Sequence, residues 1–260
     1  MSGLNPILIA KLNDAVAVGD GPEFTRRDAC LPEVPGKVHA VVGMRRAGKT
    51  TFLKQLQCDL RQSLPPERVL YLSFDDDRLD NLGSEQLNLL LEEYFRRHPE
   101  LRSTETVHWL LDEIQLVEGW ERFVRRVKDS EQMEFVVSGS SAKLLSREVH
   151  TSLRGRGMET RIGPFSFGEC LRHHGLTPKS PPDRLTSRER SLVEGRFREY
   201  LVAGGFPEAQ GLDLPLRVEL LQGYVDTVLF RDVLERHGFS QVAGLRWLTR
   251  HCLRSPARPL

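Results

Sequence analysis

Short apolar runs alternate with amphipathic stretches along the first 165 residues of the chain. Five of the runs have the length and composition of strands, at residues 37–43, 68–74, 107–113, 134–140 and 158–165. Between them, apolar residues recur at helical spacing over 49–64 and 87–95. This alternation predicts an α/β fold in which helices cover both faces of a mostly parallel sheet. Ligands in such sheets bind at the carboxyl ends of the strands.

The strand pattern stops after Pro164, and the rest of the chain has the pattern of helices. We expect them at about 166–174, 187–202 and 214–236. The stretch GGFPEA at 204–209 combines two glycines with a proline and fits a bend between helices. The sequence therefore predicts a sheet-containing core over residues 1–165 and a helical part over 166–236.

Composition places the chain among soluble globular proteins. It has 260 residues, of which 39% are hydrophobic and 28% charged, with a net charge of +1 that gives no overall signature of a nucleic-acid binder. No stretch approaches the ~20 apolar residues of a membrane span, and no N-terminal leader is visible. We expect a cytoplasmic protein without membrane contact. Its cysteines are far apart, which favours buried free thiols in a reducing compartment, at Cys30, Cys58, Cys170 and Cys252.

A glycine-containing loop follows the first predicted strand, in the stretch VVGMRRAGKTTFLKQL at 41–56. It fits the pattern G-x-x-x-x-G-K-[ST], in which backbone N–H groups and the next helix N-terminus surround the phosphates of a nucleotide. Lys49 would reach the β- and γ-phosphate oxygens, and Thr50 would offer its hydroxyl to Mg²⁺. The predicted phosphate-binding residues are Gly43, Met44, Arg45, Arg46, Ala47, Gly48, Lys49, Thr50 and Thr51.

Two adjacent carboxylates end the predicted strand VHWLLDE at 107–113. Asp112 would belong to the Mg²⁺ site, and Glu113 would polarise an attacking water. Strands that end in acidic residues are common, so this signal gains its weight from the loop upstream. A glutamate directly after the aspartate favours hydrolysis over phosphoryl transfer to a second substrate.

Ser138 ends the next predicted strand, where its hydroxyl can bond the γ-phosphate or the attacking water. Ser140 and Ser141 are substitutes for this role, and the alternative is that SGSS is a simple turn. Further on, Arg154 and Arg156 flank a glycine. Either could act as an arginine finger toward the nucleotide of a neighbouring subunit, and a surface ion pair is the equal alternative for each.

Three other polar groups have structural interpretations that we prefer. The carboxylates at 75–77 fit a solvated loop or helix cap better than a metal site. His173 and His174 fit a solvated helix end. No Asp or Glu occurs from residue 241 onward, and a basic amphipathic helix is favoured slightly over a contact with nucleic-acid phosphates for Arg246, Arg250 and Arg254.

Several segments of the chain, taken together with the spacing between them, resemble a known family. GMRRAGKTT, YLSFDD, LLDEIQLVEGWERFVRRVKD, VVSGSSAKLLSREVHTSLRGRGMETRIGPFSFGECL and GGFPEA are similar to the AAA+-like ATPases of bacteria and archaea that carry a C-terminal domain of unknown function. The resemblance covers about residues 20–235. It implies a P-loop NTPase sheet of the ASCE class, in which the strand carrying Asp112 and Glu113 lies next to the strand of the loop, followed by an all-α lid.

The resemblance also implies roles for single residues. It implies ATP and Mg²⁺ binding by Gly48, Lys49, Thr50 and Asp112, with Glu113 as catalytic base. Ser138 matches the γ-phosphate sensing position of the family, and Arg154 and Arg156 match its LRGR arginines. Family members usually continue into a winged-helix module and a nuclease-like domain, so residues 237–260 would begin that module.

The leading hypothesis is an ATP hydrolase whose lid moves with the state of the nucleotide. One alternative is a nucleotide-gated switch that holds ATP or ADP and hardly hydrolyses it. Another is a DNA-interacting protein in which the ATPase is accessory. These hypotheses allow a homo-oligomer, and a DNA or protein partner that binds through the part of the C-terminal region expected to be missing from this chain.

Overall fold

The computed structural model describes residues 3–17, 23–140, 153, 155–178, 180–229 and 241–254. The chain divides into two compact units, Met1–Pro207 and Glu208–Leu260. The three-part division expected from the sequence, with boundaries at 165 and 236, stays a prediction. Within the described ranges, no helix is long and apolar enough to cross a membrane.

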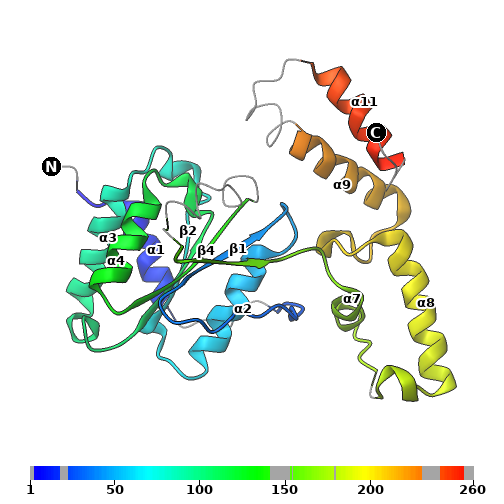
Figure 1. Cartoon of the computed structure of the whole chain (residues 1–260), viewed down its shortest axis with the longest axis horizontal. Coiled ribbons are helices and arrows are strands. Elements are labelled where there is room, and N and C mark those ends of the chain that lie inside the picture. The colour runs from blue at the N-terminus through cyan, green and yellow to red at the C-terminus, as the bar shows by residue number, and fades with distance from the viewer. Residues whose placement is uncertain are drawn as a thin grey trace. The chain divides into compact units, whose positions relative to one another are not determined.

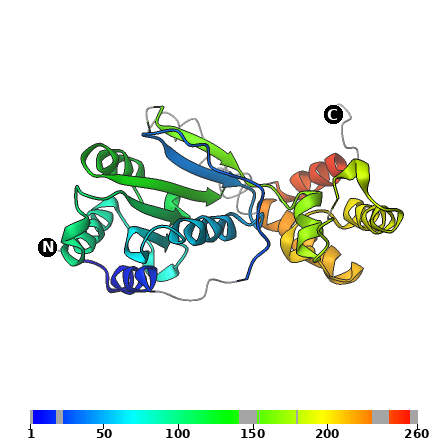
Figure 2. The ribbon, with the colours of Figure 1, turned by 90° about the horizontal axis from the view of Figure 1, so that it is seen from below.

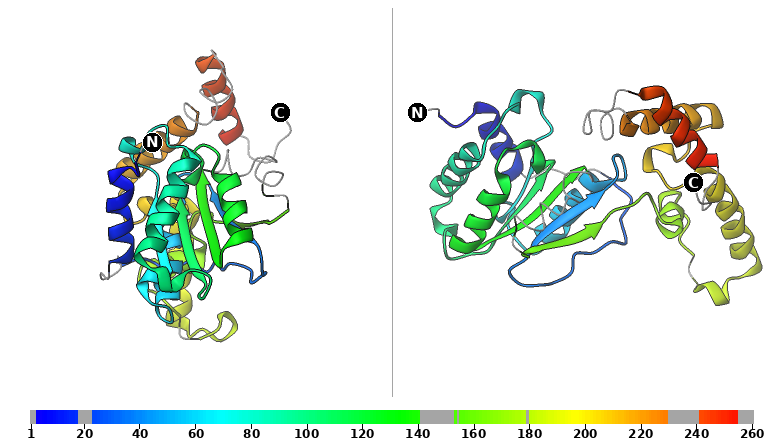
Figure 3. Two further views of the ribbon diagram at one scale, coloured as in Figure 1. Left: turned by 90° about the vertical axis from the view of Figure 1, so that its left-hand side faces the viewer. Right: turned by 45° about the horizontal axis from the view of Figure 1, so that its top comes forward.

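A five-stranded parallel sheet forms the centre of the first unit (Figure 1). Its strands are β1 (Val38–Gly43), β2 (Val69–Ser73), β3 (Val107–Asp112), β4 (Met133–Ser140) and β5 (Gly157–Arg161), in the order β2-β3-β4-β1-β5. Figure 3 shows β5 beside β1. All five apolar runs therefore form strands, as predicted. In the last run, predicted over 158–165, the strand ends earlier, at Arg161.

The family resemblance implied that the strand carrying Asp112 and Glu113 lies next to the strand that leads into the glycine loop, and this implication is wrong. β3 is not next to β1, because β4 lies between them and pairs with both. Val137 of β4 is opposite Leu111 of β3, and Ser138 is opposite Val41 of β1. β4 can take this central place because its residues at 135–137 are apolar and buried. The insertion brings Ser138 between the glycine loop and the carboxylates.

Helices cover both faces of this sheet, as the alternation predicts (Figure 2). On one face, α2 (Lys49–Arg61) buries Phe52 and Leu53 against the sheet. On the other, α3 (Ser84–Arg97) and α4 (Trp120–Ser130) pack on an aromatic cluster. In that cluster the ring of Phe135 meets those of Trp109 and Phe123 edge to face, with centroids 6.3 and 6.4 Å apart.

The sequence prediction missed the first helix, α1 (Pro6–Val16). Asn5 caps it by accepting a hydrogen bond from the Ile7 N–H at 2.8 Å, and Pro6 fits the first helical position. Leu8 and Leu12 are buried from the same helix face. The cap, the proline and the leucine spacing were all present in the sequence.

The helices after the sheet begin near their predicted positions. Capping boxes start α7 (Phe167–His173) at Ser166 and α8 (Ser187–Ala203) at Thr186. The second unit contains α9 (Leu214–Thr227) and α11 (Val242–Arg254), and residues 230–240 lie outside the described ranges. Short 3₁₀ turns occur at Pro66–Arg68, Asp77–Leu79, Pro99–Leu101, Ile114–Leu116, Pro182–Arg184 and Pro207–Ala209.

The cysteines are free, but the expectation that they are buried is wrong for two of them. Cys170 is buried, whereas Cys30 and Cys252 are exposed and Cys58 is half-buried. Cys252 lies on α11, none of whose residues is buried. Wide spacing in a sequence distinguishes free thiols from a disulfide framework, but it carries no information on burial.

Candidate nucleotide-binding site

The glycine loop connects β1 to α2 at the carboxyl edge of the sheet. Gly48 has φ 96° and Arg46 has φ 62°, so the loop turns through two left-handed residues. A side chain at Gly43 would place Cβ 2.0 Å from the Ile162 carbonyl oxygen of the neighbouring segment. Gly48 is the N-cap of α2 and provides no side-chain cap, which leaves backbone N–H groups of the first turn for a ligand.

Lys49 follows the loop and is buried, with 6% of its surface exposed. Its Nζ donates to the carbonyl oxygens of Gly43 and Met44, each at 3.1 Å. The ammonium group is therefore held above the loop by backbone dipoles. An anionic ligand in the loop would offer this buried cation a stronger partner than those carbonyl groups.

At the end of β3, the Asp112 carboxylate accepts hydrogen bonds from three hydroxyl groups. Asp112 as a whole is 2% exposed, and its Oδ2 accepts from Thr50 Oγ1 at 2.8 Å and from the Tyr71 hydroxyl at 2.7 Å. Its Oδ1 accepts from Ser138 Oγ. The structure thus brings Thr50, Asp112 and Ser138 together, as the motifs predict. The carboxylate and hydroxyl oxygens are the hard donors that Mg²⁺ prefers, so this donor set fits the ion.

Glu113 has a strained backbone. It is half-buried and adopts φ 54°, in the left-handed region that a non-glycine residue rarely enters. Its N–H donates to Ser138 Oγ at 3.4 Å, and Gln115 Nε2 donates to its carboxylate. Such strain costs on the order of 1–3 kcal/mol and is concentrated at functional sites.

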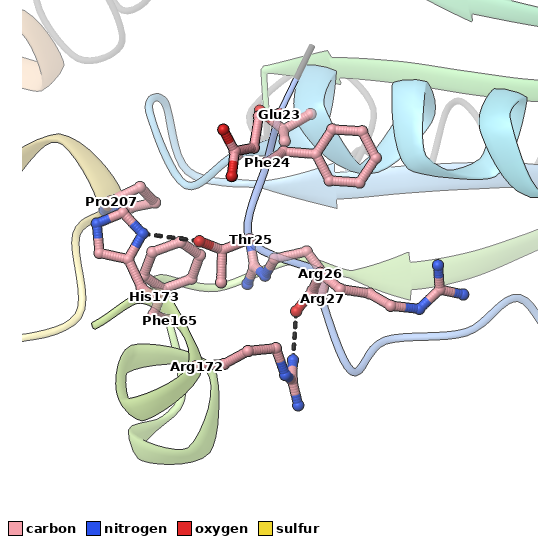
Figure 4. Close-up of a pocket in the computed structure, with 11 residues that line it drawn as sticks. Glu23, Phe24, Thr25, Arg26, Arg27, Phe165, Arg172, His173 and Pro207 are labelled. Atoms are coloured by element: carbon pink, nitrogen blue, oxygen red, sulfur yellow. Dashed lines mark hydrogen bonds between the residues drawn. The ribbon is translucent and has the colours of Figure 1, made fainter. Parts of the chain in front are cut away.

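A cavity of about 580 Å³ opens beside the loop at Gly48 and Thr51 (Figure 4). Its walls come from the segment before β1, including Phe24 and Thr25, and from Phe165 and Pro207 after the sheet. Sequence analysis missed this cavity because residues more than 100 positions apart build it, and no local pattern indicates their proximity.

His173 lines the same cavity. Its side chain is exposed, as expected for a helix end, but Nδ1 lies 2.7 Å from Thr25 Oγ1. Burial of part of the ring, followed by the neighbouring His174, lowers the pKa of His173. The ring is therefore more fully neutral near pH 7 than an ordinary histidine.

A buried arginine, also missed by sequence analysis, lies between the loop and α7. Arg27 donates from its two Nη atoms to the carbonyl oxygens of Ala47 and Gly163, both at 2.7 Å. Its Nε donates to Glu169 Oε1 at 2.9 Å. Burial alone would raise the pKa of Glu169, but hydrogen bonds from Arg27 and from two backbone N–H groups lower it below its ordinary value.

A model of the family described as "AAA domain" matches residues 35–171, a little over half of the chain. This chain belongs to the AAA-domain family. The matched residues contain the glycine loop, the Asp112 carboxylate, Ser138 and most of α7. The family indicates a nucleotide-binding, ATPase-like protein, which agrees with the resemblance stated from the sequence.

Similar proteins differ from this AAA-domain chain in length. "Uncharacterized protein MJ1544" of Methanocaldococcus jannaschii is 34% identical over 236 residues, which cover 90% of this chain and 50% of that protein. An "Uncharacterized protein" of Haemophilus influenzae is 34% identical over 77% of this chain and 47% of its own length. The chain thus spans about half the length of the curated relatives it matches. The structure of C. elegans PCH-2 aligns with a TM-score of 0.42 and 16% identity, over 75% of this chain and 61% of that one.

Of the two candidate arginine fingers, the structure describes Arg156, which lies away from the loop of its own chain. Arg154 lies outside the described residues, as does Ser141. Arg156 precedes β5, and its carbonyl oxygen accepts from the Val38 N–H at the start of β1. It is therefore at the amino edge of the sheet, opposite the loop, where its guanidinium pairs with Asp129. Its catalytic role stays a prediction.

The structural interpretation of the acidic run at 75–77 is confirmed. Asp76 caps the turn at Asp77–Leu79 by accepting from the Arg78 N–H at 3.2 Å, and it pairs with Lys11 at 3.0 Å. Hydrogen bonds from Arg78 and then Lys11 hold the pKa of Asp76 below its ordinary value. Across the described ranges, no group of three or more His, Cys, Asp or Glu side chains is arranged to hold a metal ion.

The basic residues near the C-terminus lie on α11, so the expected helix is present. Arg246 pairs with Asp226 of α9 at 3.3 Å. Trp247 and Leu253 are exposed, at 67% and 66%. A contact of this helix with nucleic acid stays a prediction.

Proposed function

We propose that this AAA-domain protein binds ATP with Mg²⁺ and hydrolyses the bond between the β- and γ-phosphates. The observation that carries the proposal is the meeting of Thr50, Asp112 and Ser138 beside Glu113, at the edge of the sheet where the glycine loop begins α2. Phosphoryl transfer to water requires a phosphate cradle, a metal site and a group that orients water. These residues can supply all three.

The loop and the residues after it would bind the phosphates. Backbone N–H groups between Gly43 and Thr51 would surround the β-phosphate, and Lys49 would exchange its carbonyl partners for phosphate oxygens. Thr50 and Asp112 would hold the ion. Bound Mg²⁺ supplies charge neutralisation on the β- and γ-phosphate oxygens.

Glu113 would act on the attacking water. Its carboxylate would accept a proton as the water oxygen bonds to the γ-phosphorus and the bond to the bridging oxygen breaks. Gln115 restrains that carboxylate, and the Gln115 Oε1 atom is buried with no hydrogen-bond partner in the described part of the chain. A water bound there would satisfy Gln115 and lie beside the base. Ser138 would report γ-phosphate through its bond to Asp112.

The cavity beside the loop would receive the nucleoside. Phe24, Phe165 and Pro207 supply flat apolar surface for a base, and Thr25 and His173 supply polar groups at its edge. Gly48 and Thr51 line the cavity and also belong to the loop. A nucleotide can therefore occupy both at once.

Arg27 would couple nucleotide state to α7. It joins the carbonyl of Ala47 in the loop to Glu169 of α7 through a single guanidinium. A loop that closes on phosphate would pull on this connection, and the helical part would respond. The position of Arg156 at the opposite edge supports turnover in an assembly, in which one copy serves the nucleotide of another.

Steady-state ATP hydrolysis with Mg²⁺, measured across a wide range of protein concentrations, tests the proposal. We expect specific activity to rise with concentration. Glu113→Gln should bind ATP without turnover, and Lys49→Ala should lose binding. Glu105→Gln removes an exposed carboxylate that pairs with Arg68 and should match the wild type. Full activity in either site variant refutes the mechanism, and tight binding without turnover at every concentration favours the switch alternative.

A further inference from the structure

A tyrosine outside the nucleotide motifs reaches the site from the edge strand β2. Tyr71 is opposite Leu110 in the register of β2 and β3, and Ser73 is opposite Asp112. Because side chains alternate along a strand, Leu110 and Asp112 point to the same face as Tyr71. The Tyr71 side chain thus extends diagonally along this face of the sheet, from β2 to the Asp112 carboxylate on β3, a distance that a long aromatic side chain can span.

The contact is a short hydrogen bond to a buried carboxylate. The Tyr71 hydroxyl donates to Asp112 Oδ2 at 2.7 Å, and Thr50 Oγ1 donates to the same oxygen at 2.8 Å. Lys54 of α2 places its Nζ 5.6 Å from the centre of the Tyr71 ring. The ring therefore lies between the helix that begins at the loop and the strand that carries Asp112.

The three donors to Asp112 have different consequences when a ligand binds. Thr50 and Ser138 come from elements that would face the metal and the γ-phosphate, so their hydroxyl groups gain new partners there. Tyr71 approaches from β2, on the other side of β3 from β4, and keeps its bond to the carboxylate. It is the donor best placed to hold the orientation of Asp112 before and after binding.

We infer that Tyr71 is a positioning residue, which holds the Asp112 carboxylate in the orientation that takes up Mg²⁺ together with nucleotide. The inference rests on the proposed function of the site. Removal of the hydroxyl would leave the cradle and Lys49 intact, so nucleotide affinity without metal should persist. The Mg²⁺-dependent part of the affinity should weaken, because partners that orient a metal ligand typically contribute 10- to 100-fold to metal affinity.

The chain offers a matched control. Tyr94 of α3 is buried, whereas Tyr71 is half-buried, and the Tyr94 hydroxyl donates to the Glu67 carbonyl oxygen at 2.8 Å. Tyr94 packs in the aromatic cluster on the face away from α2. Tyr94→Phe therefore removes a structural hydroxyl, and Tyr71→Phe removes the one that bonds Asp112.

The experiment measures binding of a non-hydrolysable ATP analogue by calorimetry, from EDTA through a series of Mg²⁺ concentrations. For Tyr71→Phe we expect unchanged affinity in EDTA and a rise of about 10-fold or more in the Mg²⁺ concentration that gives half of the metal effect. Tyr94→Phe should match the wild type in both quantities.

Each other outcome overturns the inference. A wild-type Mg²⁺ dependence in Tyr71→Phe assigns Tyr71 a structural role only. Equal shifts in the two variants indicate general loosening of the fold. Wild-type protein that binds no analogue, or binds it equally with and without Mg²⁺, refutes the proposed function as well, which separates that failure from the failure of this inference alone.

Discussion

Replacement of Arg27 by methionine tests the connection between the loop and α7. Arg27 and Glu169 have side chains that are 4% and 5% exposed, so the substitution leaves a buried carboxylate without its cation. It also removes the donors to the carbonyl groups of Ala47 and Gly163. Loss of one partner from a buried ion pair costs about 3–5 kcal/mol. At about 2–4 °C per kcal/mol for a domain of this size, Tm should fall by roughly 6–20 °C.

Arg26 provides the control for this substitution. It is adjacent in sequence and pairs with Asp59 through two hydrogen bonds of 2.8 Å, but its side chain is 59% exposed. Arg26→Met should leave the unfolding free energy nearly unchanged, because solvent and salt screen an exposed pair. The double variant Arg27→Met, Glu169→Met should be more stable than Arg27→Met alone, since it removes the unpaired charge.

Thermal unfolding measures the fall in Tm and urea unfolding measures the differences in unfolding free energy, each followed by tryptophan fluorescence and by far-UV circular dichroism. The two probes also show whether the transition is two-state. An Arg27→Met variant as stable as Arg26→Met would refute the reasoning. A double variant that is less stable than Arg27→Met would refute the part of it that assigns the cost to an unpaired Glu169.

Two further perturbations follow from the packing. Gly43→Ala places Cβ 2.0 Å from the Ile162 carbonyl oxygen and should lower the unfolding free energy by about 1–3 kcal/mol. Gly195→Ala in α8 meets no atom within 4 Å and should raise the unfolding free energy by about 0.5–1 kcal/mol. Equal effects of the two substitutions in urea unfolding would contradict this pair of predictions. Burial lowers the pKa of His108 in the folded state, so the unfolded chain binds more protons and stability should fall as pH drops below about 6.5. His108→Gln should show a smaller slope between pH 7 and 5, and an unchanged slope would contradict the assignment.

Local patterns in the sequence determined the elements and the chemistry that they carry. Periodicity of apolar residues predicts all five strands and the helices that follow them, because side-chain alternation is a property of a few consecutive residues. The motif around Gly43–Thr51 predicts a loop between strand and helix, and Asp112 ends a strand. The Asn5 cap shows that α1 was also predictable from such local signals.

Tertiary structure alone decided which of these elements meet. The insertion of β4 between β3 and β1 depends on pairing between strands, which the order of runs along the chain does not specify. Arg27 meets Glu169 across 142 positions, and the Tyr71 hydroxyl reaches Asp112 across 41. A hydrogen bond over such a separation depends on how whole layers pack. The sequence by itself therefore determined the glycine loop and the types of residue that accompany it, and only packing decided which residues hold them in place.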